Sequence, residues 1–195
     1  MNAGFFGGDS YFIDQKNILH NLYRCHQIYN DKRECIGLIK QKKAFRSVLG
    51  LITNKTIFPF LFEIRSANGG LEASVSRGWG LLKSKAIIQD AKGGKIGSIK
   101  KRSHFFKLKR GFKIMNASDE IIAEISGSFK TWSFVINDSS QRQIGSIDKE
   151  WAKEMKGLFR SDDKYNVNFE SNYSYLNNKI AILTGAIIID LFFSE

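Results

Sequence analysis

The sequence predicts an all-β protein with a central helix, a closed antiparallel barrel of about 12 strands that encloses a hydrophobic C-terminal α-helix. Three observations predict this fold class. The chain ends in an apolar run, residues 180–193. One hairpin pattern occurs five times before that run. A single proline and 17 glycines in 195 residues favour tight turns over extended linkers.

The C-terminal run predicts a core helix over residues 179–193, with Asn177 and Asn178 as its expected N-caps. The run is apolar on every face, so a helix here must be buried on all sides. A bilayer core about 30 Å thick requires about 20 apolar residues. This run has fourteen, with Asp190 near its end. We therefore expect protein to enclose the helix; insertion into a membrane is the alternative.

The repeated pattern has Ile at position n, a polar turn-forming residue at n+2, a small residue at n+9, and Ile or Val at n+11. The five sets are Ile28, Asn30, Gly37 and Ile39; Ile64, Ser66, Ala73 and Val75; Ile88, Asp90, Gly97 and Ile99; Ile114, Asn116, Ala123 and Ile125; and Ile136, Asp138, Gly145 and Ile147. Alternating apolar residues on both sides of a polar cluster are typical of a β-hairpin. Five hairpins give ten strands, and residues 11–22 supply one or two more.

The starts of the five sets are unevenly spaced, which favours an antiparallel meander over a stacked solenoid. Closing the meander into a barrel removes its edges. A fourteen-residue helix is about 21 Å long, close to the height of such a barrel. The small residues at n+9 would let the helix approach the wall. We expect a loose N-terminus over residues 1–10 and a single domain over 11–195, with a short amphipathic helix around Trp151, Met155 and Phe159 covering one barrel end.

Three segments near the C-terminus resemble, in order, the ending of the phospholipid scramblase family. They are residues 145–151, 159–169 and 183–193. The hairpin pattern upstream is similar to that of the plant and bacterial LURP-one-related proteins. Both groups are similar in fold to the tubby C-terminal domain, a barrel around a hydrophobic helix. The resemblance implies the same tubby-like architecture as the hairpins and the helix.

The net charge of +11 favours acidic partners, either nucleic acid or an anionic lipid surface. Residues 100–113 hold seven basic residues and no acid, and the candidate lipid-binding residues are Lys100, Lys101, Arg102, Lys107, Lys109, Arg110 and Lys113. Each Lys or Arg near an anionic membrane contributes about 1 kcal/mol to binding. Two alternatives are an edge strand protected from aggregation by its lysines and a nucleic-acid interface in which Phe105 and Phe106 stack on bases.

The sequence gives little indication of a metal, a cofactor or catalysis. The resemblance implies a calcium segment over residues 161–172, but Ca²⁺ takes about six to eight oxygen ligands. Asp163 is the one carboxylate at a liganding position there, so it is a weak candidate and we expect no metal. The two cysteines are too few for a disulfide framework. The three histidines lack zinc or catalytic spacing, and no nucleophile or phosphate-loop motif occurs.

The sequence therefore predicts a non-enzymatic, scramblase-related, tubby-like module that binds anionic phospholipids or phosphoinositides through a basic surface patch, without a cofactor. The alternatives are a scramblase that moves lipids between leaflets and a nucleic-acid-binding protein that uses the same patch. No signal peptide is visible at the N-terminus, so we expect a cytoplasmic protein, peripheral at a membrane surface if it binds lipid. We expect a monomer, and no feature indicates a protein partner.

Overall fold

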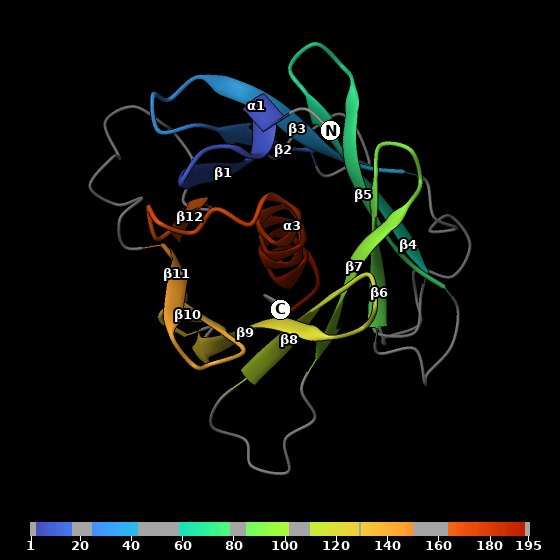
Figure 1. Cartoon of the computed structure of the whole chain (residues 1–195). Coiled ribbons are helices and arrows are strands. Elements are labelled where there is room, and N and C mark those ends of the chain that lie inside the picture. The colour runs from blue at the N-terminus through green and yellow to red at the C-terminus, as the bar shows by residue number, and fades with distance from the viewer. Residues whose placement is uncertain are drawn as a thin grey trace.

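The computed structural model describes residues 3–16, 25–42, 59–78, 85–101, 110–128, 130–149 and 164–193. These residues form a closed barrel of twelve strands with helix α3 (Leu176–Phe193) inside it (Figure 1). The predicted fold class is confirmed. The strands are β1 (Ser10–Lys16), β2 (Cys25–Tyr29), β3 (Cys35–Gln41), β4 (Phe60–Ser66), β5 (Leu71–Arg77), β6 (Lys85–Asp90), β7 (Lys95–Lys101), β8 (Arg110–Asn116), β9 (Ile121–Ser128), β10 (Ser133–Asp138), β11 (Gln143–Asp148) and β12 (Lys164–Phe169).

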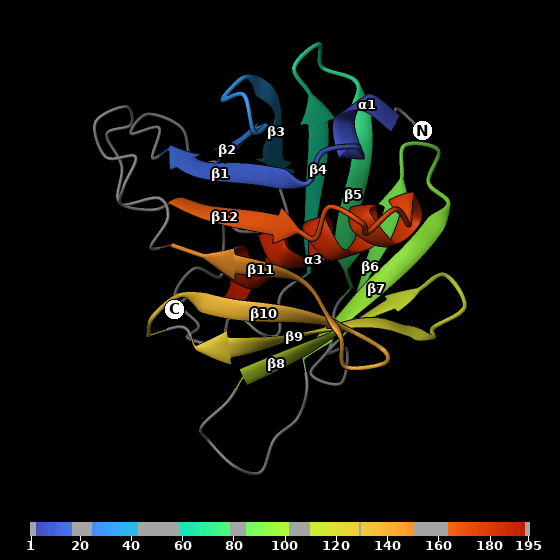
Figure 2. The same cartoon turned by 60° about the vertical axis from the view of Figure 1, so that its left-hand side comes forward.

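The barrel is an antiparallel meander in which every strand pairs with its neighbours along the chain (Figure 2). The first strand closes the barrel on the last, with Ser10 opposite Asn168 and Ile13 opposite Tyr165. The hairpin end of the barrel is defined by the five tight turns, residues 30–34, 66–70, 90–94, 116–120 and 138–142. The other end is where β7 stops at Lys101 and β8 starts at Arg110. Helix α3 runs from the hairpin end toward that opposite end.

All five predicted hairpins are present, and their turns are near copies of one another. The Ile at n lies directly opposite the small residue at n+9 in each of them, as in the pairs Ile28 and Gly37, Ile64 and Ala73, Ile88 and Gly97, Ile114 and Ala123, and Ile136 and Gly145. A β-bulge follows each Ile. The residue at n+5 has a positive φ in every turn, at Arg33, Gly69, Gly93, Asp119 and Gln141.

The polar residue at n+2 accepts backbone N–H groups of its own turn in four of the five hairpins, and the β6–β7 turn shows how. In the β4–β5 turn the Ser66 hydroxyl instead donates to the Gly70 carbonyl at 3.2 Å. The Asp90 carboxylate oxygen Oδ1 accepts hydrogen bonds from the backbone N–H of Lys92 at 2.9 Å and of Gly94 at 2.8 Å. An Asn or Asp side chain that binds its own turn in this way replaces the pairing that a bulge interrupts. In these four turns, the polar residue at n+2 of the sequence pattern is therefore the residue that holds the turn.

Helix α3 begins at Leu176, three residues before the expected start at 179. The backbone N–H of Lys179 donates to the Tyr175 carbonyl at 2.9 Å, so Asn177 and Asn178 lie within the first turn and are not the N-caps that the sequence predicted. Every residue from 180 to 189 is buried, as the apolar run requires. None of the helices in the described ranges has the length and apolarity needed to cross a bilayer.

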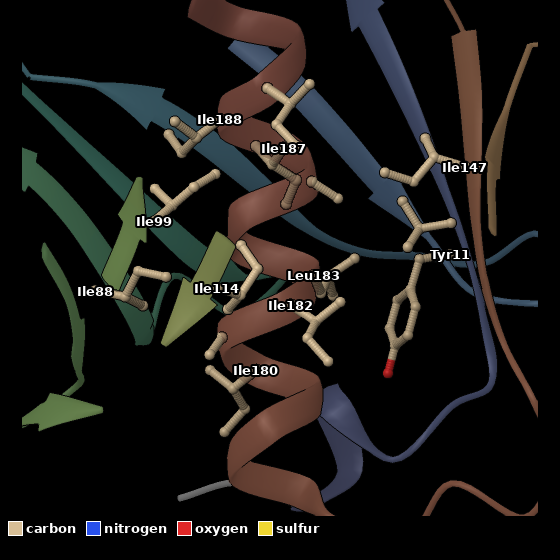
Figure 3. Packing of buried hydrophobic residues seen from close by; sticks show 14 of the residues in the cluster. Tyr11, Ile88, Ile99, Ile114, Ile147, Ile180, Ile182, Leu183, Ile187 and Ile188 are labelled. Carbon is tan, nitrogen blue, oxygen red and sulfur yellow. The ribbon is translucent and has the colours of Figure 1, made fainter. Parts of the chain in front are cut away.

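The helix packs closely on β7 and β8, and glycines on both sides make the approach possible. A Cβ on Gly97 of β7 would lie 3.2 Å from the Ala181 Cβ of α3. A Cβ on Gly185 of α3 would lie 2.5 Å from Cδ1 of Ile114 in β8. In Figure 3 the side chains of Ile99 and Ile114 lie beside the helix. Close approach to the wall, expected from the small residues at n+9, therefore holds for Gly97 and α3.

The N-terminal segment requires a correction, because residues 3–10 are not loose. Helix α1 (Ala3–Phe6) buries Phe5 and Phe6, which are 5% and 2% exposed. The Phe5 ring occupies space that Gly37 leaves open, since a Cβ on Gly37 would lie 2.6 Å from Phe5 Cε2. Two aromatic side chains can bury enough apolar surface to hold a Gly-rich segment in place. The predicted helix around Trp151, Met155 and Phe159, and residues 17–22 of the predicted first strand, lie outside the described residues.

Candidate functional site

Three of the seven predicted basic residues have described side chains, and the fold brings them together. Lys100 and Lys101 are exposed at the end of β7, and Lys113 lies on β8 directly opposite Lys100. The backbone of Arg110 begins β8, but its side chain is not among those described. Arg102, Lys107 and Lys109 lie outside the described residues. The site can therefore be built only on the described part of β7 and β8.

Lysines form a row across three neighbouring strands on the outer face of the barrel. Lys85 of β6 lies opposite Lys100, and Lys100 lies opposite Lys113. The adjacent residues Ile99 and Ile114 point inward and are buried, so alternation along a strand places these lysines outside. We call Lys85, Lys100 and Lys113 the lysine row. Like charges directly opposite one another on a sheet repel, so acidic partners or an external anion would stabilise the row.

Among the described residues, only two members of the lysine row have an acidic partner. Lys85 Nζ lies 2.5 Å from Asp119 Oδ1. Lys113 Nζ lies 3.5 Å from Glu124 Oε1 on the next strand. Lys100 is exposed and has no acidic partner among the described residues. A cation held between two others, with no acid among the described residues as its counterion, is positioned to bind an external anion.

The row is not on an edge strand. Strand β7 pairs with β6 on one side and β8 on the other, and β8 also pairs with β9. A closed barrel leaves no unpaired strand to protect. The alternative interpretation of these lysines as edge protection is therefore wrong for Lys100 and Lys113.

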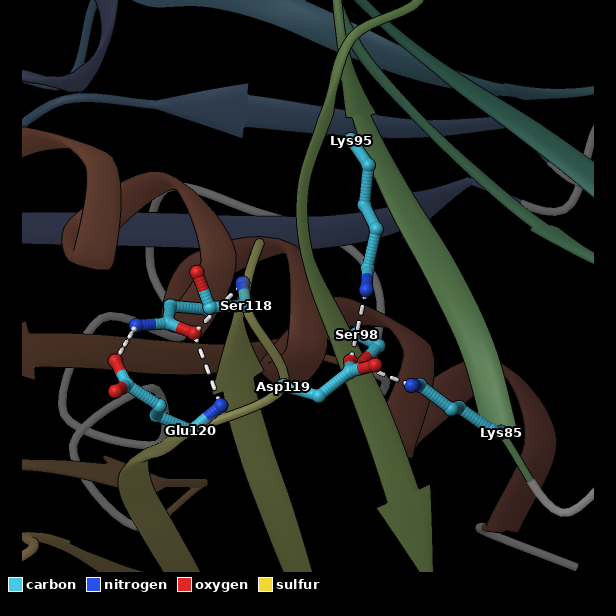
Figure 4. Close-up of polar contacts among 7 residues, drawn as sticks. Lys85, Lys95, Ser98, Ser118, Asp119 and Glu120 are labelled. Carbon is cyan, nitrogen blue, oxygen red and sulfur yellow. Dashed lines mark hydrogen bonds and ion pairs between the residues drawn. The ribbon is translucent and has the colours of Figure 1, made fainter.

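Next to the row, a carboxylate from a turn collects three donors (Figure 4). Asp119 occupies the positive-φ position of the β8–β9 turn, with φ 66°. Its Oδ1 lies 2.5 Å from Lys85 Nζ, 2.8 Å from Lys95 Nζ and 3.5 Å from the Ser98 hydroxyl. Ser98 has no exposed surface, although the lysines and Asp119 retain between 31% and 47% of theirs. We call Asp119, Lys85, Lys95 and Ser98 the Asp119 cluster.

The electrostatics of this cluster follow from the two lysines. Hydrogen bonds from Lys85 and then Lys95 to the carboxylate lower the pKa of Asp119 to about 2 from an ordinary 3.8. Both lysines favour the charged form of the acid, which is the usual effect of a cation within hydrogen-bond distance. Asp119 is therefore an anion throughout the physiological range.

The sequence did not indicate Lys85, Lys95 or Asp119 as members of a site. Lys85 and Lys100 belong to one hairpin, so the pairing of Ile88 with Gly97 would have placed them opposite each other. Asp119 belongs to the next hairpin. Its position depends on the register between β7 and β8, and no feature of the repeated pattern specifies that register.

Asp163, the weak calcium candidate, lies outside the described residues. Across the seven described ranges, no three His, Cys, Asp or Glu side chains are grouped so that they would hold a metal ion.

Comparison with known proteins agrees with this architecture. The scramblase family model matches residues 74–195, which is more than half of the chain. The X-ray structure of an Arabidopsis thaliana protein, a LURP-one-related protein, is similar with a TM-score of 0.53 and 11% sequence identity. That similarity covers 93% of this chain and 90% of the plant protein, and at this identity it shows the fold alone. No curated protein matches the chain.

The match begins within β5 and continues through the lysine row and the Asp119 cluster to the core helix. Proteins of the scramblase and tubby-like group are generally non-enzymatic. The chain belongs to the scramblase family and is a lipid-related module on a tubby-like barrel.

Proposed function

We propose that this protein binds anionic phospholipid surfaces, phosphoinositides included, through the outer face of β6, β7 and β8. The observation that supports this most is the lysine row, in which exposed Lys100 has cations on both sides and no described acid of its own. An anionic headgroup would relieve the repulsion within the row and gain about 1 kcal/mol for each lysine near the lipid surface.

We also propose that the protein is cytoplasmic and lies peripherally at an anionic membrane. A cytoplasmic leaflet carries a negative surface potential that attracts clustered lysines. Binding of this kind requires no change in the barrel, and α3 keeps its place in the core. The predicted basic residues Arg102, Lys107, Lys109 and Arg110 belong to the same segment of sequence and would add to the attraction.

The test is liposome co-sedimentation of the whole chain at low and at physiological salt, with neutral, phosphatidylserine and phosphoinositide vesicles. The diagnostic variant is Lys100→Glu, which places a carboxylate between Lys85 and Lys113. Opposite charges across a sheet are favourable, so this variant should fold at least as well as the wild type. The matched control is Lys32→Glu, an equal change of charge at an exposed lysine in the β2–β3 turn.

We expect binding to anionic vesicles only, weakened by salt and by Lys100→Glu but little changed by Lys32→Glu. Equal loss in both variants would mean that net charge, and not the lysine row, causes binding. Binding to neutral vesicles at any salt would support the scramblase alternative, in which α3 enters the bilayer. Absence of vesicle binding together with salt-sensitive binding of a polynucleotide would support the nucleic-acid alternative.

A further inference from the structure

We infer that Lys85, Lys95 and Ser98 form a phosphate-binding subsite, and that the Asp119 carboxylate is its built-in competitor, which admits phosphomonoesters and rejects singly charged phosphodiesters. This inference deepens the proposed lipid binding and rests on it. It assigns a ligand group, and a residue that selects for it, to a defined part of the surface.

The geometry of the cluster is that of an anion held from several sides. One oxygen, Asp119 Oδ1, receives both lysine Nζ groups and the Ser98 hydroxyl. The lysines come from the starts of β6 and β7, and Ser98 lies farther along β7, so two paired strands fix the positions of all three donors. Ser98 is buried and its hydroxyl points at the anion, which distinguishes the cluster from a pair of solvated lysines.

The Asp119 carboxylate can move away from the two lysines because Asp119 belongs to the turn and not to a strand. Its side chain is 47% exposed, and its own backbone is held by the turn through a hydrogen bond from its N–H to the Asn116 carbonyl at 3.1 Å. Rotation of the carboxylate about χ1 would uncover both lysines without breaking a strand pair. The rest of the turn is fixed separately, since Asn116 Oδ1 accepts the N–H groups of Ser118 and Glu120 at 3.0 Å each.

Charge determines which ligand can displace the carboxylate. A phosphomonoester carries a charge of about −1.5 to −2 at neutral pH and offers three acceptor oxygens. A phosphodiester in a lipid carries a single negative charge, like Asp119 itself, and gains little by exchange. Lys100 is adjacent to Lys85 in the lysine row and adds a third cation for the larger charge. The cluster should therefore prefer a headgroup that bears a phosphomonoester.

The chain offers a closely matched pair of variants for the test. Asp119→Asn removes the competing charge, keeps the shape of the side chain, and suits a positive φ because Asn tolerates that region. Glu120→Gln removes the same charge from the next residue, whose carboxylate binds Asn116 Nδ2 at 2.7 Å and touches neither lysine. Lys95→Gln removes one donor of the subsite itself.

The experiment measures binding of the wild type and the three variants to vesicles of equal total charge. One set contains phosphatidylserine and the other a phosphatidylinositol monophosphate. We expect the wild type to prefer the phosphomonoester lipid and Lys95→Gln to lose that preference. Asp119→Asn should bind phosphatidylserine more tightly, by about fivefold for each lysine released to the surface. Glu120→Gln should behave as the wild type does.

A soluble arm separates a lipid headgroup from free phosphate. Inorganic phosphate and inositol trisphosphate are titrated into the wild type while the backbone amide signals of Ser98 and Asp119 are followed by NMR. Shifts with inositol trisphosphate alone indicate a headgroup site, and equal shifts with inorganic phosphate indicate a general phosphate site.

The outcomes distinguish this inference from the proposed function. If the wild type binds anionic vesicles while Asp119→Asn and Glu120→Gln behave alike, the subsite is overturned and the lysine row remains. If no form binds any anionic vesicle but Ser98 and Asp119 shift with phosphate, the proposed membrane function fails and the subsite stands. If neither vesicles nor soluble phosphates have an effect, both are overturned.

Discussion

At the scale of single residues, Asp119 connects the stability of the barrel to pH. Its pKa of about 2 is below the ordinary 3.8 because Lys85 and Lys95 bind the ionised carboxylate. A group whose folded pKa is depressed stabilises the fold above its unfolded pKa, and this contribution is lost as the pH falls through the folded value. The relevant window therefore lies between about pH 4 and pH 2.

We predict that the difference in unfolding free energy between the wild type and Asp119→Asn is constant from pH 7 to near pH 4 and then shrinks toward pH 2. Urea unfolding at pH 7, 4, 3 and 2 measures it. Glu120→Gln serves as the control, because that carboxylate binds Asn116 Nδ2 and no lysine among the described residues. A difference that stays the same across this window would show that the lysine contacts do not stabilise the folded state.

Lys179 is a nearly buried cation in the first turn of α3. The positive end of the helix dipole disfavours a cation there. Asp9 offsets this, with its Oδ1 2.7 Å from Lys179 Nζ, and the Gly8 carbonyl accepts a further hydrogen bond at 3.3 Å. Only 8% of the Lys179 side chain is exposed, so little water could replace a lost partner.

We predict that Asp9→Asn lowers the free energy of unfolding by about 1.5–3 kcal/mol, the usual range for a hydrogen bond to a charged group. Adding Lys179→Met, which keeps an unbranched side chain, should recover part of the loss because no charge is then left without its partner. Urea unfolding of the two single variants and the double variant forms the cycle. Additive effects in that cycle would contradict a direct pairing.

At the scale of elements, the five hairpin turns differ in the residue at the positive-φ position, and this difference affects the stability of the protein. The β4–β5 and β6–β7 turns have glycine at the positive-φ position, and the other three have Arg33, Asp119 and Gln141. Left-handed backbone costs a non-glycine residue about 1–2 kcal/mol. Gln141 therefore stores strain that its glycine counterparts avoid.

We expect Gln141→Gly to stabilise the protein by roughly 1 kcal/mol, and Gly93→Ala to destabilise it by a similar amount. A Cβ on Gly93 would meet nothing within 4 Å, so only backbone strain changes. Ser140→Gly, one residue earlier in the same turn, should destabilise by adding freedom to the unfolded chain. Thermal unfolding of the three variants would contradict this account if Gln141→Gly and Ser140→Gly shifted the midpoint in the same direction.

Helix α3 contacts the barrel wall at Gly97 and Gly185, and the two glycines differ in the kind of atom that a side chain there would meet. A Cβ at Gly97 would lie 2.5 Å from the Met115 carbonyl oxygen, which is backbone and cannot move without disturbing the β7–β8 pair. A Cβ at Gly185 would lie 2.5 Å from the end of the Ile114 side chain, which can change rotamer. Gly97→Ala should therefore cost about 1–3 kcal/mol.

Gly185→Ala should be close to neutral, because alanine is favoured over glycine in a helix by about 1 kcal/mol. Urea unfolding compares the two substitutions. An equal cost for both would mean that the Ile114 side chain cannot move aside, so that the contact is rigid on both sides.

The sequence was sufficient to predict these elements because one pattern encodes both the turn and the pairing. Ile28 and Gly37 are opposite one another for the same reason as Ile88 and Gly97. The β-bulge after each Ile at n was not predicted. The sequence does carry a sign of it, because Ile36, Ile96 and Ile122 at n+8 are the extra residues at three of the bulges, and their side chains pack against the core. The start of α3 was misplaced because Asn177 is a good cap by composition, while tertiary packing decides where the first turn begins.

At the scale of the whole molecule, the two faces of β7 and β8 have different surroundings. The inner face holds Gly97 and Ile114 against α3, and the outer face holds Lys100 and Lys113. The proposed membrane surface is therefore backed directly by the core helix. Sequence alone predicted the basic segment but not its neighbours, because Asp119 reaches Lys85 only through the register of separate hairpins and the curvature of a closed sheet.

This arrangement predicts that α3 stays inside the barrel when the protein binds lipid. Ala186 is 1% exposed, and in a variant with Cys25 and Cys35 changed to serine, Ala186→Cys should react with a thiol reagent no faster when anionic vesicles are added. A cysteine at exposed Ser140 provides the positive control for reagent access. A vesicle-dependent rise at position 186 would instead indicate that the helix leaves the barrel, as the scramblase alternative requires.

Closure of β1 on β12 has a consequence for synthesis on the ribosome. The Ser10 hydroxyl donates a hydrogen bond to Asn168, which is 158 residues later in the chain. This bond cannot form until Asn168 has been synthesised. At a translation rate of about 5–20 residues per second, the wait is roughly 8–30 s. During that time the first strand has one unpaired side, and the helix that will fill the interior does not yet exist. The barrel can therefore close around its core only after β12 and α3 have emerged.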